Sequence, residues 1–217
     1  MIKLIIFDFD GVLVESVQVK TSAFKQLFSE YPDALFEIIT YHENNGGISR
    51  FEKISYIYRE ILKQDLSVAM HESLCQRFSA LVLQGVISAP PVPGAEEFLH
   101  FCQQRVPLVI LSGTPEDELQ TIVSARGWNE FFEDVYGSPT TKIEHLTTIC
   151  IKHEVQPQEA LYVGDARTDY EAARAVGVQF IGRINSDIPE QFSEYKDQIM
   201  LISDLLNLMN NIEEKLT

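Results

Sequence analysis

The sequence lacks the cysteine pattern of a disulfide framework or a zinc site. Its cysteines, Cys75, Cys102 and Cys150, are odd in number, widely spaced and without a CxxC pair, so reduced thiols are expected. Basic residues are also scarce, with 17 Lys and Arg against 32 Asp and Glu and a formal net charge of −15. Such a chain repels a polyanion, which argues against nucleic acid as a partner. A small phosphorylated metabolite stays compatible, because local cations or a metal can outweigh the overall field inside a cleft.

Long hydrophobic runs, internal repeats and low-complexity segments are absent as well. The apolar stretch over residues 2–9 is too short to span a membrane, and it leads into Asp8 without the cleavage site of a secretory signal. We therefore expect a cytoplasmic protein with no membrane partner, as a monomer or a homodimer. With 217 residues, 45% of them hydrophobic, the chain is long enough for one domain or for a domain with a smaller insert.

Residues 2–9 carry the first chemical signal. They are almost continuously apolar and rich in branched side chains, which predicts a strand buried on both faces. Residues two apart on a strand share a face, so Asp8 and Asp10 would both point out from its carboxyl end, where open α/β sheets bind ligands. This arrangement suits one carboxylate as a nucleophile and the other as a proton carrier. The alternative is that Asp10 and Gly11 form a turn and Asp8 caps the next segment.

The next part of the chain has helical spacing and no convincing strand. Apolar periodicity predicts helices over residues 18–30, 34–41, 50–62 and 66–86, with a sharp Asn- and Gly-rich loop at residues 44–47. A proline-rich linker follows at residues 89–94.

Helices and strands alternate after this linker. Strands are predicted at residues 108–111, 135–136, 160–163, 178–181 and 199–202. Helices are predicted at residues 95–104, 116–126, 142–153, 169–175, near 189 and at 204–214. Such alternation predicts a parallel sheet with helices on both faces, and the first strand needs these later strands as neighbours. The fold class is therefore α/β: a Rossmann-like, doubly wound core from residues 1–14 and 88–217, with an inserted α-helical cap domain at residues 15–87.

Polar residues follow two of the later strands. Ser112, Gly113 and Thr114 offer a hydroxyl and backbone N–H groups for an anion, or else a Ser/Thr cap for a helix with Pro115 near its first turn. Asp165 and Asp169 would add two carboxylates beside Asp8 and Asp10. Four such groups repel one another unless a divalent cation lies among them, and hard oxygen ligands favour Mg²⁺. Either aspartate alone could instead be a helix cap or a first-turn acid.

Two lysines lie on the helix predicted between these strands. Lys142 stands at the helix start, where it opposes the helix dipole and is unusual without a further role. In the site it would pair with Asp8 and with a phosphate oxygen. Lys152 is mid-helix, which favours a solvated surface position.

The combined spacing is far more specific than any one piece. Four segments carry it: Asp-Phe-Asp-Gly-Val at 8–12, Leu-Ser-Gly-Thr at 111–114, Gly-Ser-Pro-x-x-Lys at 137–142 and Val-Gly-Asp-x-x-x-Asp at 163–169. In this order they resemble the four signature motifs of the haloacid dehalogenase superfamily. The resemblance is to the subgroup with a helical cap that contains β-phosphoglucomutase and phosphoglycolate phosphatase.

The resemblance implies a role for each motif residue. Asp8 would attack phosphorus and form an aspartyl-phosphate, while Asp10 would protonate the leaving oxygen and later take a proton from water. Asp8, the Asp10 backbone carbonyl and Asp165 would hold Mg²⁺, with Asp169 completing or orienting that shell. The phosphoryl oxygens would be bound by Ser112, the Gly113 and Thr114 backbone and Lys142.

The cap carries the candidate specificity residues. The segment containing Gly47 and Arg50 is similar to the cap segment of β-phosphoglucomutase-like enzymes, in which an arginine binds a second phosphate; Arg50 could equally lie on a solvated face after a Ser49 cap. Lys20 stands where β-phosphoglucomutase has a histidine. It would contact a substrate anion, form a Schiff base as in phosphonoacetaldehyde hydrolase, or simply be an exposed helical lysine.

These observations predict a Mg²⁺-dependent phosphatase of the haloacid dehalogenase type, acting on a small phosphorylated metabolite such as a sugar phosphate or phosphoglycolate. A phosphosugar mutase is the first alternative, followed by a phosphonatase and by a non-catalytic binding protein. Dehalogenation is disfavoured, because a proton-handling acid such as Asp10 is useful only when a leaving group needs a proton.

Overall fold

The computed structural model describes residues 1–184, 192–195, 197–212 and 216. Its sheet has six parallel strands in the order β3-β2-β1-β4-β5-β6. The strands are β1 (Leu4–Phe7), β2 (Leu108–Pro115), β3 (Asp134–Ser138), β4 (Ala160–Gly164), β5 (Gln179–Arg183) and β6 (Met200–Ile202). The first strand thus lies between strands that come more than 100 residues later, and the predicted doubly wound α/β fold is confirmed.

Helices cover both faces of the sheet. Among the described residues after the linker, the α-helices are α5 (Ala95–Cys102), α6 (Glu116–Ala125), α7 (Lys142–Lys152), α8 (Arg167–Val176) and α9 (Leu205–Ile212). A 3₁₀ turn, η2 (Pro157–Glu159), precedes β4. Ile5 and Phe7 of β1 belong to the core beneath α5, α6 and α9. Leu4 and Ile6 belong to the opposite core, beneath α7 and α8. The alternation of strand side chains explains why all four residues are fully buried.

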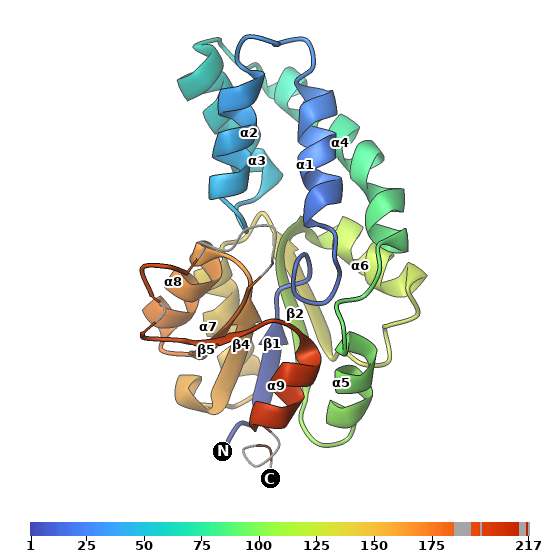
Figure 1. The fold of residues 1–217 in the computed structure, drawn as a ribbon, viewed down its shortest axis with the longest axis vertical. Helices are drawn as coiled ribbons and strands as arrows, with labels where there is room; N and C mark the ends of the chain where they lie inside the picture. Colours follow the sequence, from blue (N-terminus) through green and yellow to red (C-terminus); the bar gives the residue numbers. More distant parts are fainter. Residues whose placement is uncertain (185–191, 196, 213–215, 217) are drawn as a thin grey trace.

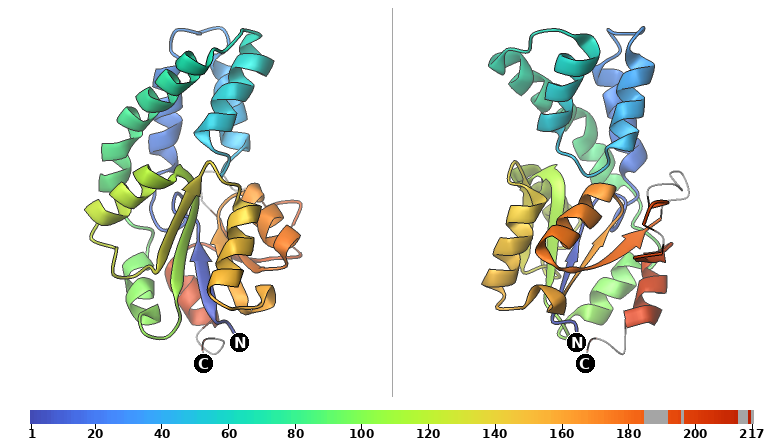
Figure 2. Two further views of the ribbon diagram at one scale, coloured as in Figure 1. Left: turned by 180° about the vertical axis from the view of Figure 1, so that it is seen from behind. Right: turned by 90° about the vertical axis from the view of Figure 1, so that its left-hand side faces the viewer.

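The inserted segment is helical and stands at the carboxyl ends of the strands (Figures 1 and 2). It consists of α1 (Val17–Leu27), α2 (Leu35–Asn44), α3 (Arg50–Tyr56), a π-helical turn η1 (Ile57–Leu62) and α4 (Val68–Ser88). The two connections to the sheet lie side by side, since Val14 bridges to Pro91 and the Glu15 N–H donates to the Pro90 carbonyl at 3.0 Å. The division into core residues 1–14 and 88–217 and cap residues 15–87 stays a prediction.

The element boundaries differ from the sequence prediction in two places that matter for the site. β1 ends at Phe7, two residues early, because the chain turns at Phe9, whose carbonyl accepts from the N–H groups of Leu13 and Val14. β2 continues to Pro115, four residues late, through a shift in its register with β3. The helix predicted near Pro189 lies outside the described residues. Within the described part of the chain, no helix is long and apolar enough to cross a membrane.

Candidate active site

The site begins where β1 gives way to a tight turn. The Asp8 N–H continues the sheet ladder by donating to the Val163 carbonyl at 2.9 Å. Asp10 lies beyond the strand, and Gly11 follows with a φ of +75°, a conformation that suits glycine. Asp10 and Gly11 therefore do form the turn considered as the alternative. The two aspartates are brought to one place by this turn and not by the alternation of a strand.

Asp8 pairs with Lys142, the first residue of α7. The Lys142 Nζ lies 2.9 Å from Asp8 Oδ2 and also contacts Asp169, and all three side chains are at most 10% exposed. Burial outweighs the favourable effect of Lys142 and raises the pKa of Asp8 to about 6. The lysine remains charged, because Asp169 and Asp8 raise its pKa against the effect of burial. The two carboxylates thus share one buried cation.

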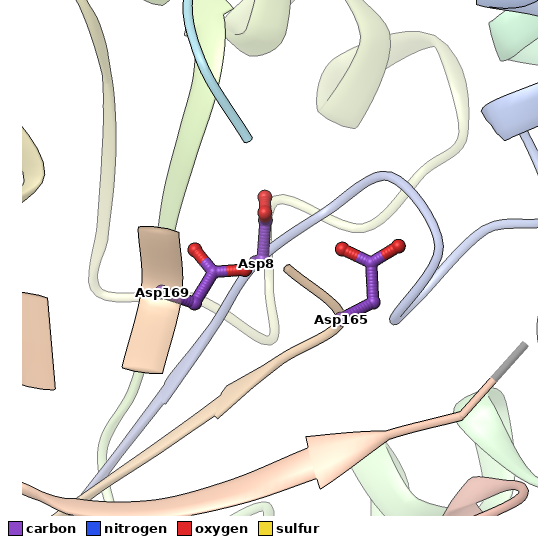
Figure 3. Close-up of side chains that lie close together, drawn as sticks. All are labelled: Asp8, Asp165 and Asp169. Atoms are coloured by element: carbon purple, nitrogen blue, oxygen red, sulfur yellow. The ribbon is translucent and has the colours of Figure 1, made fainter. Parts of the chain in front are cut away.

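Three carboxylates converge beside this lysine. Asp8, Asp165 and Asp169 each place an oxygen within 4.8 Å of the others, at the ends of β1 and β4 and in the first turn of α8 (Figure 3). The Asp169 carboxylate accepts hydrogen bonds from Lys142, from the Tyr162 hydroxyl at 2.7 Å and from the Ala166 N–H at 2.9 Å. It is therefore placed to orient the cluster.

Asp165 differs from the other two members of the cluster in its hydrogen bonding. Among the described residues no donor reaches its buried carboxyl group, and burial together with Asp8 and Asp169 raises its pKa well above the usual range. A Cβ on Gly11 would lie 2.1 Å from Asp165 Oδ2, so only glycine allows this approach. Buried carboxylates with one shared lysine and one member without a donor match the oxygen-ligand chemistry of a divalent cation.

Asp10 lines the same pocket but is not a member of this cluster, and its carboxylate contacts three other side chains. Its carboxylate accepts from Ser16 Oγ at 2.6 Å and Thr114 Oγ1 at 3.0 Å, and it forms an ion pair with Lys20. Although burial favours the protonated form, the Lys20 ammonium lowers the pKa of Asp10. Lys20 also donates to Thr114 Oγ1 at 2.8 Å. The interpretation of Lys20 as an exposed helical lysine is thus wrong.

The segment Ser112 to Thr114 is extended, and not the helix-opening turn predicted. α6 begins only at Glu116, and Pro115 at its N-cap supplies no side-chain hydrogen bond. The Ser/Thr capping alternative is therefore wrong, because the Thr114 hydroxyl is used by Asp10 and Lys20. The Thr114 N–H lies 3.3 Å from Ser112 Oγ, so in this structure it faces that hydroxyl.

The cap touches the core directly above this segment. A Cβ on Gly113 would lie 2.6 Å from the Gly47 carbonyl oxygen, and the Thr168 hydroxyl donates to the Gly46 carbonyl at 3.0 Å. Gly47 itself has a φ of +74°. The loop between α2 and α3 therefore closes over the strand ends and encloses a pocket. Residues lining the pocket include Asp8, Asp10, Lys20, Gly47, Arg50, Ser112, Gly113, Thr114 and Asp165.

Arg50 lines this pocket but already has a carboxylate partner. Its guanidinium forms two hydrogen bonds with Glu118 of α6, one of them at 2.8 Å, and contacts Ser79 of α4. With 4% of the residue exposed, its placement on a solvated face is wrong, although the Ser49 side chain does cap α3 by accepting from the Glu52 N–H. Lys152 is the last residue of α7 and not mid-helix as predicted, but its side chain is 53% exposed, so the predicted surface position is confirmed.

Several residues of the site have no sequence signal. Tyr162 lies in the middle of β4 and reads as an ordinary core residue, yet its hydroxyl holds Asp169. Glu118 and Lys53 look like surface charges of amphipathic helices, but one pairs with Arg50 and the other lines the pocket. Ser16, the residue before α1, donates to Asp10. Their partners lie far away in the chain or across a turn, where periodicity carries no information.

Comparisons with known proteins agree with this geometry. A phosphoglycolate phosphatase from Pseudomonas putida is 25% identical over 193 residues, which cover 83% of this chain and 68% of that protein. A validoxylamine A 7′-phosphate phosphatase from Streptomyces hygroscopicus subsp. limoneus is 27% identical over 209 residues, covering 89% and 91%. The crystal structure of β-phosphoglucomutase from Clostridium difficile has the same fold, with a TM-score of 0.79, 18% identity and coverage of 100% of this chain and 97% of that one. The sequence profile of the haloacid dehalogenase-like hydrolases matches residues 5–183, and the chain therefore belongs to this family of hydrolases.

Proposed function

We propose that the protein is a Mg²⁺-dependent phosphatase that hydrolyses a small phosphate monoester through an aspartyl-phosphate. The observation that carries this proposal is the pairing of Asp8 with Lys142 beside a cluster of three buried carboxylates. Two relatives named as phosphatases of small metabolites support the choice of a phosphate ester, in the manner of phosphoglycolate or a sugar phosphate.

In this proposal Asp8 is the nucleophile. Its carboxylate attacks phosphorus, the bond from phosphorus to the ester oxygen breaks, and Asp10 gives a proton to that oxygen. In the second step Asp10 takes a proton from water, which attacks the aspartyl-phosphate and releases phosphate. The ion pair with Lys20 favours the ionised Asp10 that this second step needs, so the first step requires Asp10 to take up a proton before it can pass one to the ester oxygen.

The remaining motif residues position the phosphoryl group and neutralise its charge. Ser112, the backbone of Gly113 and Thr114, and Lys142 would bind its oxygens. Asp8, the Asp10 backbone carbonyl and Asp165 would hold Mg²⁺, with Asp169 orienting them. When bound, the ion supplies positive charge that offsets repulsion between the carboxylates and the phosphoryl group.

Lys20 bears on the alternatives. Schiff-base chemistry needs an amine that is free to attack a carbonyl, whereas this amine is engaged with the Asp10 carboxylate and with the Thr114 hydroxyl. A phosphosugar mutase would share the core residues, so activity must separate it from a phosphatase.

The test is phosphate release from sugar phosphates, phosphoglycolate, nucleotides and p-nitrophenyl phosphate, with and without Mg²⁺. We expect Mg²⁺-dependent release that disappears in Asp8→Asn. Isomerisation of a sugar phosphate with little phosphate release would instead identify a mutase, and binding without any turnover would indicate a non-catalytic protein.

A further inference from the structure

The cap side of the pocket contains a buried lysine that has no carboxylate partner among the described residues. Lys53 of α3 lines the pocket together with Asp8 and Ser112, and only 4% of the residue is exposed. Its Nζ donates to His42 Nδ1 and to the His42 carbonyl, both at 3.1 Å. The carbonyl carries no charge. The imidazole is also neutral, because burial and the nearby lysines lower the pKa of His42 to about 2.

The other cations around the pocket are already neutralised. Lys20 pairs with Asp10, Arg50 pairs with Glu118, and Lys142 pairs with Asp8 and Asp169. Glu43 also lines the pocket, but its side chain is exposed and it forms no ion pair with Lys53. Lys53 therefore differs from the other described cations of the site in forming no ion pair, although Asp165 raises its pKa from further away.

The surroundings of Lys53 make this unpaired charge costly. Phe24 and Phe78 line the same pocket, and although Nζ lies over the Phe24 ring at 5.8 Å from its centre, this weak cation–π contact does not replace a carboxylate. An ammonium has three donors, and His42 accepts from only two of them. Burial and, to a smaller extent, Lys20 lower the pKa of Lys53 to about 7 against the opposite effect of Asp165, so an anion in the pocket would favour the charged form.

We propose that Lys53 binds a second anionic group of the substrate, a carboxylate or phosphate at the end of the molecule opposite the reacting phosphoryl group. Because the Gly47 loop closes over Gly113, a monoester held at Asp8 and Ser112 extends toward the cap wall that contains Lys53. The inference rests on the proposed function for the position of the phosphoryl group. It assigns substrate selection to Lys53, and not to Arg50, whose guanidinium is occupied by Glu118.

The experiment compares phosphoglycolate with ethylene glycol monophosphate, which has a neutral hydroxymethyl group in place of the carboxylate. Binding is measured by calorimetry in Asp8→Asn with Mg²⁺, so that no turnover intervenes. We expect phosphoglycolate to bind about tenfold or more tightly than the neutral ester, as a charge-assisted hydrogen bond implies. Adding Lys53→Met should remove this preference, while Lys53→Arg should keep most of it. Lys25→Met, at an exposed position of α1, is the matched control.

Ethylene glycol bisphosphate as a third ligand tells whether the second anion is a carboxylate or a phosphate. An unchanged preference in Lys53→Met, equal weakening of the charged and neutral esters, or no binding of either phosphoglycolate or ethylene glycol bisphosphate at millimolar concentration overturns the inference. Phosphate release by the unmodified protein is measured in parallel. If phosphate is released but Lys53→Met does not change the preference for the charged ester, the phosphatase proposal stands and this inference is wrong. If the preference depends on Lys53 but no phosphate is released, this inference stands and the phosphatase proposal is wrong.

Discussion

At the scale of single residues, Thr114 connects the proposed proton carrier to the cap. Its hydroxyl donates to Asp10 and accepts from Lys20, so it fixes both side chains at once. Thr114→Val keeps the shape and removes these hydrogen bonds. We expect kcat for an alkyl phosphate to fall about tenfold, because a displaced Asp10 protonates the leaving oxygen less efficiently.

The leaving group provides the internal check on this prediction. For p-nitrophenyl phosphate, whose leaving group needs no proton, kcat should fall much less. Thr121→Val, at an exposed position of α6, should change neither rate. Equal losses with both substrates would show that Thr114 acts on the phosphoryl group and not through Asp10.

His42 predicts a pH-dependent stability. It is neutral when folded, with a pKa lowered to about 2 mainly by burial, and has an ordinary value of 6.5 when unfolded. Below pH 6.5 the unfolded chain therefore binds more protons, so the free energy of unfolding falls as the pH falls, by up to about 1.4 kcal/mol per pH unit from this group.

Urea unfolding at about pH 7.5, 6.0 and 5.0, on either side of the ordinary His pKa, measures this effect. His42→Gln keeps an acceptor for Lys53 and does not titrate, so its stability should depend less on pH in this window. His100→Gln, at an exposed position of α5, should follow the unmodified protein. Parallel curves for His42→Gln and the unmodified protein would contradict the prediction.

At the scale of elements, the loop between α2 and α3 meets the core through Gly47. A Cβ there would lie 2.2 Å from Thr168 Oγ1, at a φ of +74°. In Gly47→Ala the Thr168 hydroxyl has to move and loses its hydrogen bond to Gly46, so the cap cannot close as it does here. We expect kcat/KM to fall at least about tenfold, since closure completes the site.

Gly127→Ala is the matched control for backbone strain. Gly127 has a φ of +72°, and nothing lies within 4 Å of a Cβ built there. Both variants should lose roughly 1–2 kcal/mol of stability from the left-handed backbone, but Gly127→Ala should keep its activity. Equal kcat/KM values for the two variants would show that the Gly47 contact is not needed for catalysis.

At the scale of the whole molecule, the carboxylate cluster couples folding to Mg²⁺. Bound Mg²⁺ should raise the melting temperature. At a concentration about one hundred times Kd, it should add about 2.7 kcal/mol to the free energy of unfolding. Asp165→Asn should abolish this effect. Without Mg²⁺ the same variant should melt at a higher temperature than the unmodified protein, because it removes a buried carboxyl group whose pKa is raised by burial and by its acidic neighbours.

Thermal unfolding with and without Mg²⁺ measures both effects independently of activity. Asp33→Asn, at an exposed position between α1 and α2, should respond to Mg²⁺ like the unmodified protein. A Mg²⁺ response that survives in Asp165→Asn would place the ion elsewhere.

The sequence by itself determined the fold class, the helical insertion and the meeting of the motif residues. Asp8, Lys142, Asp165 and Asp169 could be predicted to lie together because each follows a predicted strand of one parallel sheet, and the carboxyl ends of such strands share an edge. Short, nearly continuous apolar runs were enough for this result, since a strand covered on both faces has this distinctive composition.

Only the tertiary structure decided which charges are paired and which are not. Arg50 and Glu118 are 68 residues apart, and Lys20 and Thr114 are 94 apart, so no local pattern connects them. The same holds for Tyr162, which resembles a core residue, and for Lys53, which resembles a surface lysine. Whether a charge is buried, and beside which partner, depends on how helices of the insertion pack against a sheet assembled from the other end of the chain. That packing is set by the whole set of apolar contacts and not by the sequence around any one residue.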